Sequence, residues 1–145
     1  SVDEILNLNI LQASLLSMKR AIKKLTEKPN LKTAQEFTAT QNFNATTLSD
    51  ASTIAWDASA HQVTSVTLGA NRALGAATNQ VDGAVYVISV IQDGTGSRTL
   101  SFNSNYKFTD GSAPTLTTTA SARDILVFVS NGTNMFEIGR SLNVS

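Results

Sequence analysis

The first 25 residues carry apolar side chains at alternating intervals of three and four residues. This is the spacing of the a and d positions of a coiled coil, and it is followed by Leu8, Leu11, Leu15, Met18, Ile22 and Leu25. Acidic residues near the start and lysines near the end complement the helix dipole, and Pro29 would end the helix. We therefore predict a coiled-coil stem over residues 1–28 that associates with copies of itself. Leu and Met in this seam do not fix the number of chains.

Three further apolar residues, Leu6, Ile10 and Leu16, lie off this seam. They give the N-terminal half of the predicted helix a second apolar face. Two interpretations are open. The face widens the core of a helical bundle, or it docks the helix onto a larger body.

After Pro29 the pattern changes to short β-branched runs separated by turn residues. Residues 29–50 form a polar connector, and residues 51–145 are predicted to form a head of β-strands. The run at 84–92 is apolar on both faces, so it is expected to be a central strand, or one held between the core and a subunit interface. The strongest hairpin signal is Asn131-Gly132. The expected strands are residues 53–56, 63–68, an edge segment around 73–74, and residues 84–92, 97–102, 124–130 and 133–138.

Seven or so short strands with turn signals between them predict a mainly β fold, a β-sandwich of jelly-roll-like form. Neighbouring heads are expected to pack through strand faces such as those of residues 84–92 or 124–130. Trp56 is the only tryptophan. We favour a place in the core for its ring over an exposed platform on which a sugar would stack.

The amino-acid composition of the chain limits the kinds of partner that it can be expected to bind. Charged residues make up 15% of the chain, against about 25% in an average domain. The basic residues within 19–32 are interpreted as a solvated helix flank and not as a nucleic-acid site, because no aromatic residues are interleaved with them. The chain has no cysteine, which excludes disulfides and thiolate metal sites. We find no apolar run long enough to cross a membrane and no signal-peptide pattern. Because the chain begins with Ser1, an initiator Met or a longer upstream segment before it is left open.

No pattern indicates catalysis, a cofactor or a metal site, so we expect a protein that is not an enzyme. His61 is the only histidine and is interpreted as an exposed loop residue, since no Gly-x-Ser-x-Gly motif accompanies it. The aspartates are scattered singly and are explained as turn residues. Three copies of His61 or of one aspartate could still ring an ion at a trimer axis. Arg98 is expected to pair with Asp93 or with Asp124.

A spaced series of motifs resembles a known family. In chain order it runs through Thr53–Asp57, Gln92–Leu100, Asn105–Phe108, Ala113–Leu116, Arg123–Leu126 and Phe128–Met135. The series resembles the small β-module of tailed-bacteriophage virion proteins, found in tail-fibre heads, receptor-binding tips and some capsid-attached fibres or decoration proteins. The resemblance covers roughly residues 53–139 and implies a homotrimer of heads on a helical stem. The module has no agreed catalytic or metal-binding set, so it assigns none here.

The combined prediction is a structural protein of the virion, with other virion proteins as its partners. The favoured form is a trimeric fibre or spike whose head adheres to a glycan or protein of the host surface. The alternative is a capsid-attached head fibre or decoration protein anchored by its N-terminal helix. Polar, turn-rich loops are the expected tip of the head, and their candidate residues are Asn105, Tyr106, Lys107, Asp110, Asn131 and Asn134.

Overall fold

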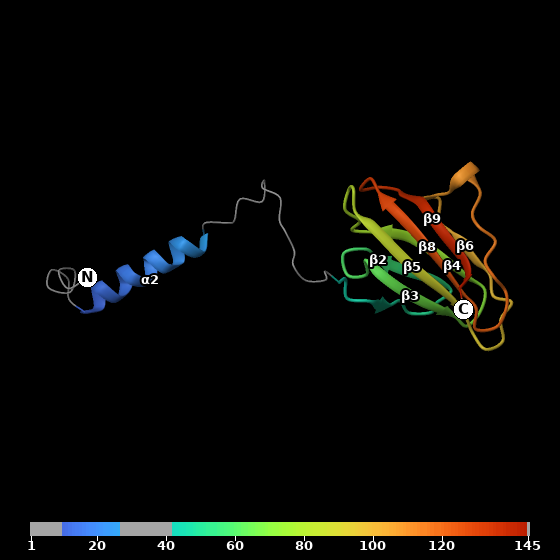
Figure 1. The fold of residues 1–145 in the computed structure, drawn as a ribbon, viewed down its shortest axis with the longest axis horizontal. Helices are drawn as coiled ribbons and strands as arrows, with labels where there is room; N and C mark the ends of the chain where they lie inside the picture. The colour runs from blue at the N-terminus through green and yellow to red at the C-terminus, as the bar shows by residue number, and fades with distance from the viewer. Residues whose placement is uncertain (1–9, 27–41, 145) are drawn as a thin grey trace. The chain divides into compact units, whose positions relative to one another are not determined.

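The chain divides into two compact units, residues 1–41 and residues 42–145. A computed structural model describes residues 10–26 of the first unit and residues 42–144 of the second. Each unit is described by itself (Figure 1). No helix among these residues is both long and apolar enough to cross a bilayer.

The described part of the stem is a single α-helix, α2, over Ile10–Thr26. This confirms the predicted helix over that range. Two seam residues, Leu15 and Met18, are 55% and 61% exposed, and Leu16 is half-buried. The other predicted positions lie outside the described residues, as Leu6 and Leu8 do, or have side chains outside the description, as Ile10, Leu11, Ile22 and Leu25 do.

The head is built from two β-sheets. Sheet A has six strands in the order β1-β3-β5-β8-β9-β7, and sheet B has three in the order β2-β4-β6. A short 3-10 helix, η1, spans Thr109–Gly111. The strands are β1 (Thr46–Thr47), β2 (Thr53–Asp57), β3 (Val63–Leu68), β4 (Arg72–Thr78), β5 (Val85–Gln92), β6 (Leu100–Phe102), β7 (Tyr106–Lys107), β8 (Arg123–Ser130) and β9 (Met135–Val144).

From β1 to β6 the chain passes from one sheet to the other at every step, so strands adjacent within a sheet run parallel. This holds for β1 with β3, β3 with β5, β2 with β4, and β4 with β6. Only β8 pairs antiparallel, with β5 and with β9. The mainly β prediction is confirmed. Its jelly-roll-like detail is wrong, because a jelly roll pairs its strands antiparallel.

Two predicted strands differ in place or length. The segment around 73–74 is part of β4, which lies at the centre of sheet B and not at an edge. The strand predicted at 97–102 begins only at Leu100, because Ser97 has a positive φ of 60° and belongs to the preceding turn. The strand predicted at 133–138 is longer and extends to Val144.

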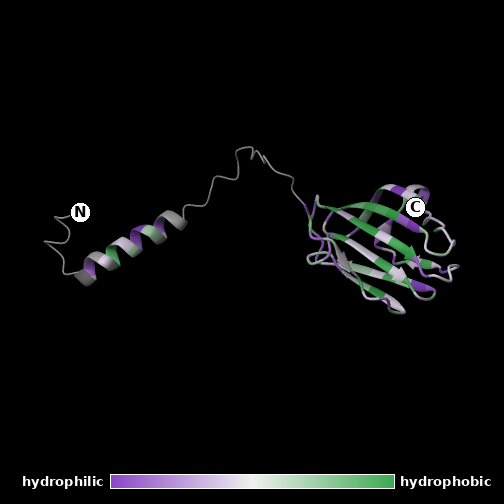
Figure 2. Ribbon diagram, turned by 60° about the horizontal axis from the view of Figure 1, so that its bottom comes forward, coloured by the Kyte–Doolittle hydropathy of each residue, from purple (hydrophilic) through white to green (hydrophobic). Residues whose placement is uncertain are grey.

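The two sheets share one hydrophobic core, to which both contribute buried side chains. Figure 2 shows hydrophobic residues in bands along the strands of the head. Trp56 of β2 is buried, as predicted, and its ring stacks on Tyr106 and meets Tyr86 and Phe128 edge-on, with centroids 6.3–6.4 Å apart. Its indole Nε1 donates to the carbonyl oxygen of His61 at 2.7 Å, which satisfies the ring's one polar atom.

The loops of the head gather at two opposite ends, because the strands of each sheet run alongside one another. The near end is where residue 42 enters, and there Thr46 Oγ1 and His61 Nδ1 share a hydrogen bond of 2.8 Å. It also holds loops 58–62, 79–84 and 131–134, and Gln80 Nε2 donates to the carbonyl oxygen of Thr133. The far end holds Asp50, loops 69–71 and 93–99, and residues 117–122.

Asp124 of β8 joins three segments at the far end, and we predict that it carries much of the head's stability. It is buried, and its carboxylate accepts the main-chain N–H groups of Thr117 at 2.6 Å and Asn143 at 2.8 Å. In Asp124→Ala both donors lose a charged acceptor, so the free energy of unfolding should fall by about 3 kcal/mol. Urea denaturation measures the change.

The matched control is Asp82→Ala, which removes an exposed aspartate from the turn between Val81 and Ala84. It should change the free energy of unfolding by no more than about 0.5 kcal/mol. Equal effects of the two substitutions would contradict the assignment.

Candidate functional site

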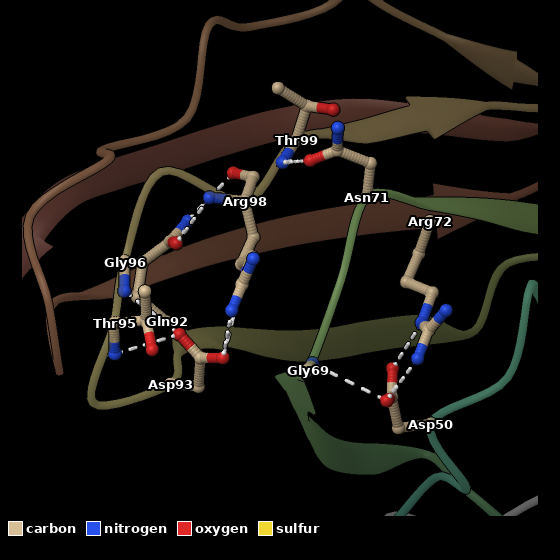
Figure 3. Close-up of polar contacts among 10 residues, drawn as sticks. All are labelled: Asp50, Gly69, Asn71, Arg72, Gln92, Asp93, Thr95, Gly96, Arg98 and Thr99. Carbon is tan, nitrogen blue, oxygen red and sulfur yellow. Dashed lines mark hydrogen bonds and ion pairs between the residues drawn. The ribbon is translucent and has the colours of Figure 1, made fainter.

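The turn of residues 93–98, at the far end of the head, is a polar surface held by several hydrogen bonds and an ion pair. Asp93 Oδ1 accepts the N–H groups of Thr95 at 3.0 Å and Gly96 at 2.8 Å. Its Oδ2 accepts Nε and Nη2 of Arg98 at 3.0 and 2.8 Å (Figure 3). Arg98 therefore pairs with Asp93, one of its two expected partners. The other, Asp124, binds main-chain groups elsewhere.

Gln92, the last residue of β5, also holds this turn in place through two hydrogen bonds. Its buried amide accepts the Arg98 N–H through Oε1 and donates to the Arg98 carbonyl oxygen through Nε2, both at 2.9 Å. Gly96 has a φ of 73°, and a Cβ on it would lie 2.6 Å from the carbonyl oxygen of Thr118. Glycine is thus required there by both backbone conformation and space.

A second ion pair lies beside this turn in Figure 3. Arg72, at the start of β4, donates from Nε and Nη2 to the carboxylate of Asp50 at 2.7 and 2.6 Å. Asp50 also accepts the Gly69 N–H at 3.3 Å. Asn71 Oδ1 accepts the N–H of Thr99 at 3.0 Å, so the loop between β3 and β4 is tied to the residues that follow the 93–98 turn.

The charges at this end are compensated. Hydrogen bonds from Arg72 hold the pKa of Asp50 below its usual value, and hydrogen bonds from Arg98 do the same for the pKa of Asp93. Both carboxylates therefore stay ionised at neutral pH, each beside its arginine. The far end presents fixed polar groups with balanced charge, which suits an uncharged polar ligand better than a phosphate.

A small cavity of about 120 Å³ opens next to Arg98, between the start of β6 and the segment that crosses toward β8. Hydroxyl and methyl groups of threonine alternate with apolar side chains around it. Its lining residues are Arg98, Thr99, Leu100, Pro114, Thr115, Leu116 and Thr118. These groups can hold a ligand by hydrogen bonds and apolar contact. No group of three or more His, Cys, Asp or Glu that could hold a metal ion occurs in the described part of the chain.

The six predicted tip residues do not form one exposed surface. Tyr106 is 4% exposed and its hydroxyl donates to the carbonyl oxygen of Gly75, so its prediction as a tip residue is wrong. The pattern Asn-Tyr-Lys-Phe placed it in a loop, but β7 turns its ring into the core. Burial raises the pKa of this hydroxyl far above its usual value.

The two asparagines of the 131–134 turn lie at the near end. Asn131 Oδ1 accepts the N–H groups of Thr133 and Asn134 at 3.1 and 2.8 Å, so this side chain builds the turn. Asn105 is half-buried, and its carbonyl oxygen accepts the Met135 N–H. Lys107 and Asp110 are exposed.

Two features were not foreseen from the sequence. His61 was expected to be exposed but is half-buried, because Thr46 binds its ring. Glu137 has a side chain only 3% exposed that binds Arg140 through Oε2, while its Oε1 has no hydrogen-bond partner. Successive side chains of a strand point to opposite faces, so the buried Met135 would have predicted that Glu137 also lies on the inner face of β9.

Comparison with known proteins assigns this head to a family. A family model described as "Putative phage tail fibre C-terminal domain" matches residues 32–135. The chain belongs to this family. It is accordingly a component of a bacteriophage virion, and the resemblance seen in the motifs is confirmed. No curated protein and no solved structure matches the chain.

The tail-fibre family supports a structural role in a tail fibre, the first of the two hypotheses from the sequence. It gives no support to the alternative of a capsid-attached fibre or decoration protein. The matched range contains the whole far-end surface, from Asp50 to the turn of residues 93–98 and the segment that crosses to β8.

Two glycines of the tail-fibre head's 93–98 turn provide a matched test of its packing. In Gly96→Ala the new Cβ meets main-chain atoms of Thr118 and Ala120 at 2.6 and 2.7 Å, and φ is positive. The free energy of unfolding should fall by more than about 2 kcal/mol. Gly94→Ala faces open space and should change it by less than about 0.5 kcal/mol. A thermal or urea melt that does not separate the two variants would refute this geometry.

Proposed function

We propose that this chain is the trimeric, non-enzymatic end of a tail fibre, whose head adheres to the host surface. The observation that carries the proposal is the match of the tail-fibre C-terminal domain over residues 32–135. The far end supports a binding role, since its polar groups are held by main-chain and ion-pair contacts before any ligand arrives. Its partners are the neighbouring chains of the fibre, other virion proteins and a glycan or protein of the host.

The stem supplies the first means of assembly. Leu15 and Met18 occupy neighbouring seam positions of α2 and are largely exposed in a single chain. An exposed apolar seam of this spacing favours burial against identical helices. Leu15 and Leu16 line one shallow surface pocket together with Gln12 and Lys19. Leu16 is the one residue of the predicted docking face whose side chain is described, and its place next to the seam supports the interpretation as a wider bundle core.

We assign adhesion to the far end. The head receives its chain at the near end, where residue 42 leads into β1 and Thr46 meets His61. The loops at 131–134 lie at this same end, so they are poorly placed for a contact remote from the point of attachment. The far-end loops at 69–71 and 93–99 are the ones most distant from it along the strands.

The test compares single substitutions at the two ends in the full chain. Thr95→Arg and Thr119→Arg place a bulky charged side chain on exposed positions of the far end, and Thr133→Arg does the same at the near end. Purified protein should compete with the virus for adsorption to its host cells. Far-end substitution should raise the concentration needed for half-inhibition about tenfold or more, and Thr133→Arg should leave it unchanged.

The opposite pattern would return the site to the 131–134 loop first predicted from the sequence, in which Asn131 is exposed. Full competition by all three variants would contradict adhesion through either end of the head. Circular dichroism of each variant serves as the check on folding.

A further inference from the structure

The outer face of sheet A is apolar, although it lies on the side away from the core. Strand register places its side chains in rows that cross the sheet. One row is Val85, Val129 and Phe136, and the next is Val63, Val87 and Val127. These rows meet no covering segment among the described residues, and Val85 and Phe136 are 44% and 39% exposed.

The apolar surface continues beyond these two rows. Ile138, at the bulge where β9 shifts register against β8, is 58% exposed. The third row consists of three serines and Ile125. Within β3, β5, β8 and β9 the first charged side chain appears in the fourth row, as Arg123 beside Ile91, and at the margin of the sheet Lys107 of β7 lies next to Phe136 at the end of the first row. Within these four strands three successive rows thus carry no charge, and the nearest charges, Lys107 and Arg123, lie at the margin of the face.

Sheet B shows that this is not a general property of the head. Its outward positions carry small or polar residues, and the exposed ones are Thr53, Ala55, Ala76, Thr78 and Ser101. A sheet with one face in water normally alternates apolar and polar residues in this way. Strands β5 and β8 are instead apolar on both faces, which is typical of strands covered on both sides.

We infer that the outer face of sheet A is the surface through which the heads of neighbouring copies of this chain bind one another. The inference rests on the proposed trimeric fibre and names the head surface that takes part in it. In the assembly each head turns rows Val85–Val129–Phe136 and Val63–Val87–Val127 toward the other copies, while the far end stays free for the host.

The extent of the face fits a stable contact. Eight residues of β5 and four strands, β3, β5, β8 and β9, span about 26 Å by 19 Å. The projected area is on the order of 500 Å², and protruding side chains make the accessible area larger. A stable protein interface takes about 800 Å² from each partner, so the whole face, with its serine row included, supplies a large part of the area that such a contact needs.

The chemistry favours a second copy over a different protein. Identical faces that carry charge only at their margins, on Lys107 and Arg123, can meet through their apolar centre, whereas a face built for a foreign partner usually carries charges that select it. The same chain also exposes Leu15 and Met18 of the stem seam. Both apolar surfaces would be buried at once if the copies align side by side.

The experiment separates the head contact from the stem contact in the full chain. Leu15→Asp with Met18→Asp disables the seam at two positions that are exposed in the single chain. We expect this stem variant still to associate, because the heads hold it, when its mass is followed against concentration by light scattering. Adding Val85→Thr, Val127→Thr and Val129→Thr keeps the shape and strand preference of the side chains but places hydroxyls on the face. The dissociation constant should then rise about tenfold or more.

The matched control adds Ala55→Thr and Ala76→Thr to the stem variant, on the outer face of sheet B. These should leave the dissociation constant unchanged, and unaltered urea unfolding of the Val→Thr variant would show that its fold is kept.

A stem variant that is monomeric at all concentrations overturns the inference but leaves the proposed function intact if the unsubstituted chain is a trimer. A monomeric stem variant that also binds more hydrophobic dye would identify the chain's own stem as the cover. A monomeric unsubstituted chain contradicts both proposals.

Discussion

Burial of Trp56 between the two sheets is the contact on which the head depends. Its ring touches aromatic side chains of three strands of sheet A, namely Tyr86, Tyr106 and Phe128. Its one polar atom is satisfied by the His61 carbonyl oxygen, so it can be buried without an unmet hydrogen bond. Strand β2 of sheet B supplies this ring, and strands of sheet A pack around it. The chain reaches this arrangement by crossing from one sheet to the other.

This crossing order explains why the two ends of the head differ. Each crossing from sheet A to sheet B or back requires a loop at one end. The far-end loops are held by side chains such as Asp93, Gln92 and Asp50, which bind main-chain groups of their own or neighbouring turns. The near-end turns are also held by side chains, since Asn131 and Asp57 bind main-chain groups of their own turns. The two aspartate–arginine pairs, however, lie at the far end. A polar surface held by hydrogen bonds and ion pairs therefore forms at the end of the head opposite residue 42.

Local pattern was sufficient to predict the helix, most strands, the Asn131-Gly132 turn and the core place of Trp56. These features depend on periodicity and turn chemistry within a few residues. The parallel pairing was not predictable in the same way, because it depends on which distant strands share a sheet. Tyr106 was misplaced for the same reason: a polar neighbourhood suggested a loop, but pairing of β7 with β9 turns the ring inward. The far-end pairing of Asp50 with Arg72 joins residues 22 positions apart and left no local signal.

We infer that the head of this tail-fibre protein buries the outer face of sheet A against its own copies. Because the chain has no cysteine, a single introduced thiol reports on one position. The most direct measurement is the rate of thiol labelling of Val85→Cys in the full chain, beside Ala55→Cys on the outer face of sheet B. Both positions are exposed in the single chain. The account predicts strong protection at position 85 and rapid labelling at position 55, and equally rapid labelling at both would contradict it.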